Sequence, residues 1–103
     1  MKKKIYISGP ISGRDLQERR RTFAAVAEDI YRMGDIPVNP LDNGIPASFP
    51  WSEHMRRDLQ MLLKCSAVCM LPGWKRSRGA RLEHHVAEEL GMDIFDYEKT
   101  QKK

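Results

Sequence analysis

Short apolar runs alternate with longer amphipathic segments along the chain, and this alternation predicts four strands and three helices. The strands are expected at the apolar runs 4–8, 36–38, 67–71 and 94–95. The helices are expected where apolar residues recur every three or four positions, at 15–33, 52–64 and 79–90. Strands that alternate with helices form parallel sheets with right-handed crossovers. The predicted fold class is α/β: one Rossmann-like (flavodoxin-like) domain over residues 1–103, with a four- to five-stranded parallel sheet flanked by helices.

The predicted boundaries depend on residues that interrupt or cap regular structure. Gly9-Pro10 and Pro72-Gly73 end two strands. Gly34 and Gly91 suit the C-terminal ends of two helices, and Ser52 is expected to cap the start of the middle helix. Parallel sheets bind ligands beyond the carboxyl ends of their strands. A site is therefore expected among the loops 9–14, 39–51 and 72–78.

The composition narrows the class of protein. About 41% of the 103 residues are hydrophobic, enough for one core. No apolar run approaches the ~20 residues needed to cross a bilayer, and the N-terminus lacks a signal peptide, so we expect a soluble, cytoplasmic protein without a membrane partner. The formal net charge is +4, but part of it comes from lysines near the two ends, which are expected to be solvated tails. The bulk charge therefore does not indicate nucleic-acid binding. These terminal lysines are Lys2, Lys3, Lys4, Lys99, Lys102 and Lys103.

The cysteine and histidine pattern predicts neither a metal site nor a cofactor. Cys65 and Cys69 would lie ~13 Å apart in an extended chain, too far for a disulfide, so both are expected to be buried thiols. Adjacent His84 and His85 point in different directions on a helix, and no zinc-type spacing is present. The loop 9–13 also lacks the dinucleotide-binding glycine pattern and the Walker lysine.

Glu83 is the first candidate for chemistry, because it falls inside the apolar arc of the helix 79–90. A carboxylate that faces a core is costly, and burial raises its pKa. Glu83 also lies near the helix N-terminus, at the end where the site is expected. The alternative is a structural acid that pairs with Arg81 or compensates the helix dipole. The arc consists of Leu82, Val86, Ala87 and Leu90.

Asp58 is the second candidate acid. It flanks the apolar face of the helix 52–64, beside the predicted site. The alternative is a boundary acid paired with Arg57 or His54. The apolar face consists of Met55, Leu59, Leu62 and Leu63, and that of the helix 15–33 consists of Leu16, Phe23, Ala27, Ile30 and Tyr31.

The segment 77–80 opens the last helix, and its free backbone N–H groups favour an anion. Ser77 can add a hydroxyl, and basic residues surround it at Lys75, Arg76 and Arg78. The alternative is that Ser77 only caps the helix while the basic side chains are solvated. Trp51 and Trp74 flank the expected crevice, where each could stack on a base or serve in packing.

Five segments together resemble the nucleoside 2-deoxyribosyltransferase-like superfamily over nearly the whole chain. The resemblance is closest to a short branch often found in phages and mobile elements, and deoxyribonucleoside monophosphate N-hydrolases are better-characterised relatives. The segments are IYISGPI at 5–11, VNP at 38–40, RDL at 57–59, LPGW at 71–74 and SRGARLE at 77–83.

The resemblance implies cleavage, by hydrolysis or transfer, of the N-glycosidic bond of a deoxyribonucleoside or its 5′-monophosphate. By motif, Glu83 would be the nucleophile, Asp58 would orient the sugar hydroxyls or the leaving base, and Tyr6 would position Glu83. Ser77 and the Gly79 amide would hold a 5′-phosphate. The remaining substrate-binding residues implied are Ser8, Gly9, Pro10, Ser12 and Asn39.

Several positions depart from the relatives. Pro10 and Ser12 stand where the hydrolases have serine and arginine for phosphate, Ser66 replaces an acid, and Arg81 replaces a glycine; Arg14 could substitute for the missing arginine. Pro10, Ser12 and Ser66 favour an alternative, a catalytically silent nucleotide-binding or sensor module. A third hypothesis is a nucleic-acid or protein-interaction factor that uses the basic loops.

The chain is also expected to form a homodimer or larger homo-oligomer. A domain of this size buries a modest share of its surface alone. Met55, Met61 and Trp51 add more apolar surface than one sheet face needs, which is typical of interfaces. The resemblance points the same way, because relatives pair through helices beside the site and lend residues across the interface.

Overall fold

The alternation of strands and helices is confirmed in the computed structural model, which describes residues 2–97. The strands are β1 (Lys4–Ser8), β2 (Ile36–Val38), β3 (Ala67–Met70) and β4 (Asp93–Asp96). The α-helices are α1 (Leu16–Arg32), α2 (Trp51–Leu62) and α3 (Arg78–Glu89), and two short 3₁₀ turns are η1 (Pro40–Asp42) and η2 (Trp74–Arg76). The predicted solvated lysines at 99, 102 and 103 lie outside the described residues.

All four strands of the sheet are parallel, in the order β2-β1-β3-β4. The fold class is therefore α/β as predicted, with the flavodoxin-like strand order and a four-stranded sheet. The chain moves from β1 outward to β2 and then returns to the other side of β1 as β3. This reversal makes the carboxyl ends of β1 and β3, where Ser8 pairs with Met70, the topological switch point at which such sheets bind ligands.

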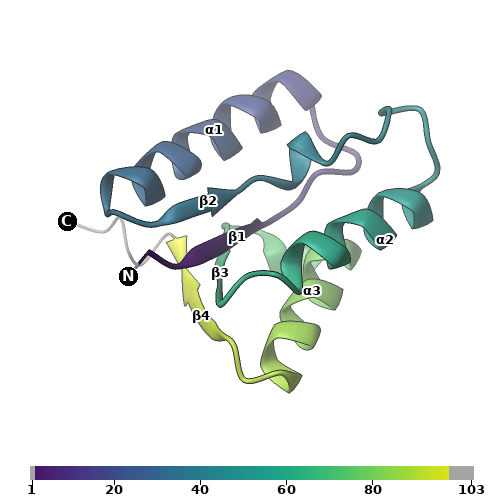
Figure 1. The fold of residues 1–103 in the computed structure, drawn as a ribbon. Helices are drawn as coiled ribbons and strands as arrows, with labels where there is room; N and C mark the ends of the chain where they lie inside the picture. Colours follow the sequence, from purple (N-terminus) through teal and green to yellow (C-terminus); the bar gives the residue numbers. More distant parts are fainter. Residues whose placement is uncertain (1, 98–103) are drawn as a thin grey trace.

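Alternate residues of the central strands face opposite layers. One face, which includes Ile5, Ile7 and Cys69, packs against α1 through Phe23 and Ile30. The other face packs against α2 and α3, which lie together on the far side of the sheet from α1 (Figure 1). The residues of this second core are Tyr6, Leu62, Val68, Met70, Ala80 and Ala87. Because side chains alternate along a strand, Tyr6 and Ser8 both point toward α3.

The apolar stripes of the helices are narrower than predicted. Tyr31 is 67% exposed, Leu63 57% and Leu90 59%, and Leu82 is also more than one third exposed. Each is one position from a buried residue or at a helix end, so it points roughly 100° away from the face that a four-stranded sheet can cover. Met55 is buried and Met61 packs against the core, so they do not supply the exposed apolar patch expected of them.

One predicted cap is wrong. The helix α2 begins at Trp51 after Pro50, whose φ of −60° suits a helix entry, and no side chain caps it. Ser52 therefore lies in the first turn of α2, and Trp51 belongs to the helix instead of the preceding loop. Ser77 does cap α3, because its Oγ accepts from the Ala80 amide.

Both cysteines are free thiols, as predicted, and Cys69 is buried. The predicted burial of Cys65 is wrong, because this residue follows the end of α2 and is half-buried. Burial raises the pKa of Cys65 to about 11 and that of Cys69 to about 12, so both remain protonated at neutral pH. Within residues 2–97 no three His, Cys, Asp or Glu side chains gather as metal ligands. In the same residues, no helix has the length and apolar character needed to span a membrane.

Candidate active site

Glu83 lies on the inner face of α3, beneath the carboxyl end of β1. Its side chain is buried with a residue exposure of 5%. The Tyr6 hydroxyl donates to Oε2 at 2.7 Å, and the Ser8 hydroxyl donates to Oε1 at 2.7 Å. The hydrogen bond expected from Tyr6 is therefore present, and Ser8 makes a second one. Arg81, the alternative partner, donates instead to the Lys75 carbonyl at 3.2 Å.

The surroundings of Glu83 leave its carboxyl poised between two charge states. Burial raises its pKa to about 7, aided by the negative charge of Asp58, while the hydrogen bonds from Ser8 and Tyr6 oppose the rise. Tyr6 has a pKa raised well above its usual value by burial and by Glu83, so its hydroxyl stays protonated and can donate. The result is a weakly solvated carboxylate whose two oxygens are held by neutral donors.

Asp58, on α2, is equally buried and is held by Asn43, which the sequence analysis missed. The Nδ2 of Asn43 donates to Oδ1 of Asp58 at 2.8 Å and lies 3.2 Å from Nδ1 of His54. The Oδ1 of Asn43 accepts from the Ile45 amide at 2.9 Å. Burial raises the pKa of Asp58, and the Asn43 hydrogen bond with the nearby His54 and Arg57 opposes that rise. Asn43 thus ties the long loop before α2 to the second acid.

His54 and Arg57 reach Asp58 through Asn43, not through the direct pairing considered above. Arg57 Nε donates to the Asn43 carbonyl at 3.1 Å. The Nε2 of His54 lies 3.0 Å from the Pro46 carbonyl, which can only accept. This network assigns the proton of a neutral His54 to Nε2 and leaves Nδ1 as the acceptor for Asn43.

A cavity of about 750 Å³ opens above the two acids, a size that suits a small-molecule site. All three loops predicted to form the site contribute to it. The predicted residues that line it are Gly9, Pro10, Ser12, Asp58, Ser77, Gly79 and Glu83. Tyr6 and Ser8 do not line the cavity, but both donate hydrogen bonds to Glu83 at its floor. Asn39 is not part of the cavity, because its side chain accepts from the Leu41 amide and caps η1.

Two of the glycines at the site are explained by close packing. A Cβ on Gly9 would lie 2.8 Å from Cβ of Leu71, so only glycine lets the loop after β1 lie against the end of β3. A Cβ on Gly79 would lie 3.0 Å from Sδ of Met55, where α3 approaches α2. Gly79 therefore has a packing reason in addition to its predicted role at a phosphate.

Basic side chains line the mouth of the cavity, but not all of those predicted. Arg76 and Arg78 line it, whereas Lys75 lies over the Trp74 ring, 5.8 Å from the centroid. The Arg78 guanidinium stacks over the Trp51 ring, 4.0 Å from its centroid. Trp74 stacks on His84 with ring centroids 4.2 Å apart and does not line the cavity, so of the two tryptophans only Trp51 lines it.

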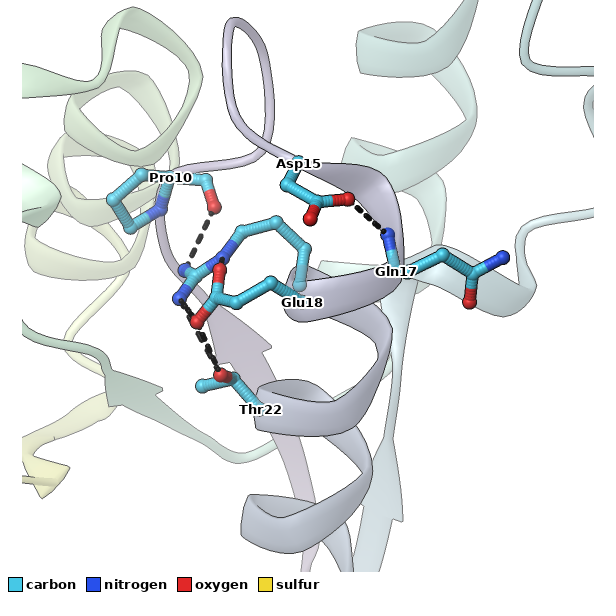
Figure 2. Close-up of polar contacts among 6 residues, drawn as sticks. Pro10, Asp15, Gln17, Glu18 and Thr22 are labelled. Atoms are coloured by element: carbon cyan, nitrogen blue, oxygen red, sulfur yellow. Dashed lines mark hydrogen bonds and ion pairs between the residues drawn. The ribbon is translucent and has the colours of Figure 1, made fainter.

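Arg19 is a second residue that the sequence analysis missed. Although charged, it is buried on α1, and its Nη1 donates to the Pro10 carbonyl at 3.1 Å. Glu18 accepts from both Nε and Nη2 of Arg19, and Thr22 accepts from Nη2. Figure 2 labels these acceptor residues, Pro10, Glu18 and Thr22. Arg19 thereby fixes the loop after β1 that borders the cavity. Its spacing with Phe23, within the buried stripe of α1, is the signal that would have identified it.

Comparisons with known proteins agree with this architecture. The family described as "Domain of unknown function (DUF4406)" matches residues 3–96. No curated protein matches the chain. Among solved structures, a 2-desoxiribosyltransferase from Leishmania mexicana is similar at 21% identity and a TM-score of 0.67, over 91% of this chain and 63% of that one. A 2-deoxyribosyltransferase from Bacillus psychrosaccharolyticus has 18% identity and a TM-score of 0.69, over 90% and 70% of the two chains.

A conserved protein from Enterococcus faecalis V583 is also similar, with 17% identity and a TM-score of 0.69, over 93% and 63% of the two chains. This chain thus spans 63% to 70% of the length of these structures. At such identities the likeness establishes a shared fold. The structural resemblance to 2-deoxyribosyltransferases implied by the sequence motifs is confirmed.

Proposed function

We propose that this chain, which belongs to the DUF4406 family, cleaves the N-glycosidic bond of a deoxyribonucleoside or its 5′-monophosphate with Glu83 as the nucleophile. One observation carries the proposal: a buried carboxylate is held by the Tyr6 and Ser8 hydroxyls at the floor of a cavity, at the switch point of the sheet. The fold shared with proteins described as 2-deoxyribosyltransferases supports it.

In the proposed reaction, an ionised Glu83 oxygen attacks the anomeric carbon as the bond to the base breaks. The base leaves with the bonding electron pair and takes up a proton, and the sugar remains as an ester on Glu83. Water or a second base then attacks the same carbon and releases Glu83. Each Glu83 oxygen keeps a free lone pair while it accepts from Tyr6 or Ser8, so the hydrogen bonds orient the nucleophile without blocking it.

Asp58 is proposed to orient the sugar hydroxyls or the leaving base. Its Oδ1 accepts from Asn43, and the residue borders the same cavity as Glu83. The raised pKa of Asp58 brings its protonated form closer to neutral pH, in which it could also donate to a leaving nitrogen. Because His54 and Arg57 both contact Asn43, the orientation of Asp58 depends on the folded loop before α2.

The phosphate of a monophosphate substrate is proposed to bind where Ser77 and Gly79 open α3. The free amides of this helix and the adjacent arginines favour an anion there. Arg14 lines the cavity. This position supports Arg14 as the substitute for the phosphate-binding arginine that the hydrolase relatives have where this chain has Ser12. The Ser66 departure lies at the amino end of β3, where its amide donates to Lys4, away from the cavity at the other end of the strand.

A catalytically silent nucleotide-binding module is the second candidate, favoured by Pro10 at the cavity wall in place of a serine. The deciding experiment is incubation with a panel of deoxynucleosides and their 5′-monophosphates, followed by chromatography for free base. Turnover that is lost in Glu83→Gln and kept in Glu89→Gln, an exposed acid of the same helix, supports the enzyme. Binding of nucleotides without base release from any of them, or from the corresponding di- and triphosphates, supports the silent module.

A further inference from the structure

The arginines of this protein differ in whether their guanidinium groups are hydrogen-bonded to the protein. Of the ten arginines in the sequence, four donate hydrogen bonds from their guanidinium groups to protein acceptors, namely Arg19, Arg32, Arg57 and Arg81. The other six have no such bond to any of residues 2–97, and four of those six line the cavity above Glu83. These four are Arg14, Arg20, Arg76 and Arg78.

The four guanidinium groups approach the cavity from two sides. Arg14 and Arg20 come from the loop after β1 and the first turns of α1, while Arg76 comes from the end of η2 and Arg78 from the start of α3. The two sides meet, because Nη2 of Arg14 lies 3.5 Å from where a Cβ on Gly73 would stand. Arg78, on the second of these sides, stacks over the Trp51 ring.

The positive charge of these four arginines exceeds the negative charge of the carboxylates that line the cavity. Glu83 and Asp58 are the carboxylates that line the cavity, and both have raised pKa values, Glu83 to about 7. Together they therefore carry fewer than two full negative charges at pH 7, against four guanidinium groups, of which Arg14 also interacts with the Glu18 carboxylate outside the cavity. Clustered like charges repel, so an anionic ligand would stabilise this cluster of four arginines.

A nucleoside monophosphate does not match this charge. One phosphate monoester carries about −1.5 to −2 at pH 7, which two arginines satisfy. Added phosphates extend both the negative charge and the length of the ligand. The cavity of about 750 Å³ reaches from the acids at its floor to Arg20 on α1, so it has room for a longer ligand.

We propose that the substrate of this site is a deoxynucleoside di- or triphosphate, whose first phosphate is bound by Arg14 and Arg78 and whose outer phosphates are bound by Arg20 and Arg76. The inference rests on the proposed function, because the sugar and base are placed against Glu83. The phosphate next to the sugar lies at the start of α3 beside Arg78, and the outer phosphates continue toward Arg20. Guanidinium groups bind such oxygens in bidentate fashion.

The test is calorimetry on the Glu83→Gln protein, which permits binding without turnover, in a buffer with chelator and fixed ionic strength. The ligands are the mono-, di- and triphosphate of each deoxynucleoside, with inorganic phosphate, pyrophosphate and tripolyphosphate as base-free probes. Affinity is expected to rise about tenfold for each phosphate that gains a charged hydrogen bond. Equal affinities for mono- and triphosphates would overturn the proposal, as would tighter binding of a 5′-phosphorylated oligonucleotide than of any triphosphate.

Two matched double variants separate a built site from general attraction. Arg20→Ala with Arg76→Ala removes two cavity arginines, whereas Arg21→Ala with Arg56→Ala removes two exposed arginines outside the cavity. The ratio of triphosphate to monophosphate affinity is expected to fall toward one in the first protein and to persist in the second. An equal fall in both would assign the preference to net charge and refute the site.

The outcomes also distinguish this inference from the proposed function. Base release from monophosphates or nucleosides without a triphosphate preference would keep the function and overturn the inference. Tight, arginine-dependent binding of tripolyphosphate without base release from any nucleotide would keep the polyphosphate site and overturn the glycosidic reaction.

Discussion

Replacement of Glu83 by glutamine should make the protein more stable at alkaline pH while it removes the nucleophile. Glu83 is buried, and the rise of its pKa from 4.5 to about 7 means that folding disfavours its ionised form. The raised pKa of Glu83 does not reduce the free energy of unfolding below pH 4.5, where the carboxyl is protonated in both the folded and the unfolded state. The cost grows as pH rises and is complete above pH 7, where it reaches roughly 3 kcal/mol.

Glutamine removes this ionisation but disturbs the hydrogen bonds. Its amide nitrogen must face either Tyr6 or Ser8, each of which now donates to a carboxylate oxygen at 2.7 Å. One rearranged hydrogen bond costs about 1 kcal/mol. The variant should therefore gain about 2 kcal/mol at pH 8, equivalent to roughly 10 °C in Tm for a domain of this size, and be about 1 kcal/mol less stable at pH 4.5.

The assay is urea unfolding followed by tryptophan fluorescence, at intervals between pH 4.5 and 8.5. Tyr6 and Asp58 are the titratable groups that act on Glu83, and they remain in the variant, so the difference between the two proteins reports the ionisation of Glu83 together with its coupling to Asp58. Glu89→Gln, on the exposed face of α3, serves as the control and should track the wild type. A stability difference between Glu83→Gln and wild type that is constant across this pH range would refute the assigned burial and pKa.

Four further predictions concern the site and the assembly. Base release should increase as pH rises through about 7, where Glu83 ionises, and a rate that is flat from pH 5.5 to 8 would contradict the nucleophile. Tyr6→Phe should slow base release about 10- to 100-fold, because a hydrogen bond to a charged group is lost, and should shift that pH profile upward; an unchanged profile would show that Tyr6 does not act on Glu83. Deoxynucleosides with a 5′-phosphate should bind more tightly than free nucleosides in calorimetry, and equal affinities would remove Ser77 and its arginine neighbours from the site. Light scattering at micromolar concentration should give the mass of a dimer or larger assembly, and a monomer mass would refute the expected pairing.

The sequence by itself determined the elements of the fold and the buried acid. A period of two places Tyr6 and Ser8 on one face of β1, and a period of 3.6 places Glu83 on the inner face of α3. These relations depend on the local geometry of single elements, which the residue pattern encodes directly. The helical period of 3.6 also places Arg19 on the buried face of α1, four positions before Phe23, although Arg19 is charged.

The tertiary structure alone decided which loop residues meet. Asn43 and Asp58 are 15 positions apart, and their contact depends on how an irregular loop folds over α2. Asn39 was predicted at the site, but Asn43 is the asparagine that contacts Asp58. The cause is the same, because an irregular loop has no period that predicts which way each side chain points. The order of the strands likewise brings Arg14 next to Gly73 across the switch point.

The extent of each buried stripe was also decided by packing between elements. Tyr31 and Leu90 are apolar at helical spacing, yet they are exposed because the four-stranded sheet covers only one narrow face of each helix. Periodicity shows the direction in which a side chain points, but burial requires a neighbour at that place. Neighbours distant in sequence are brought there by the fold as a whole, because close packing is a property of several elements at once.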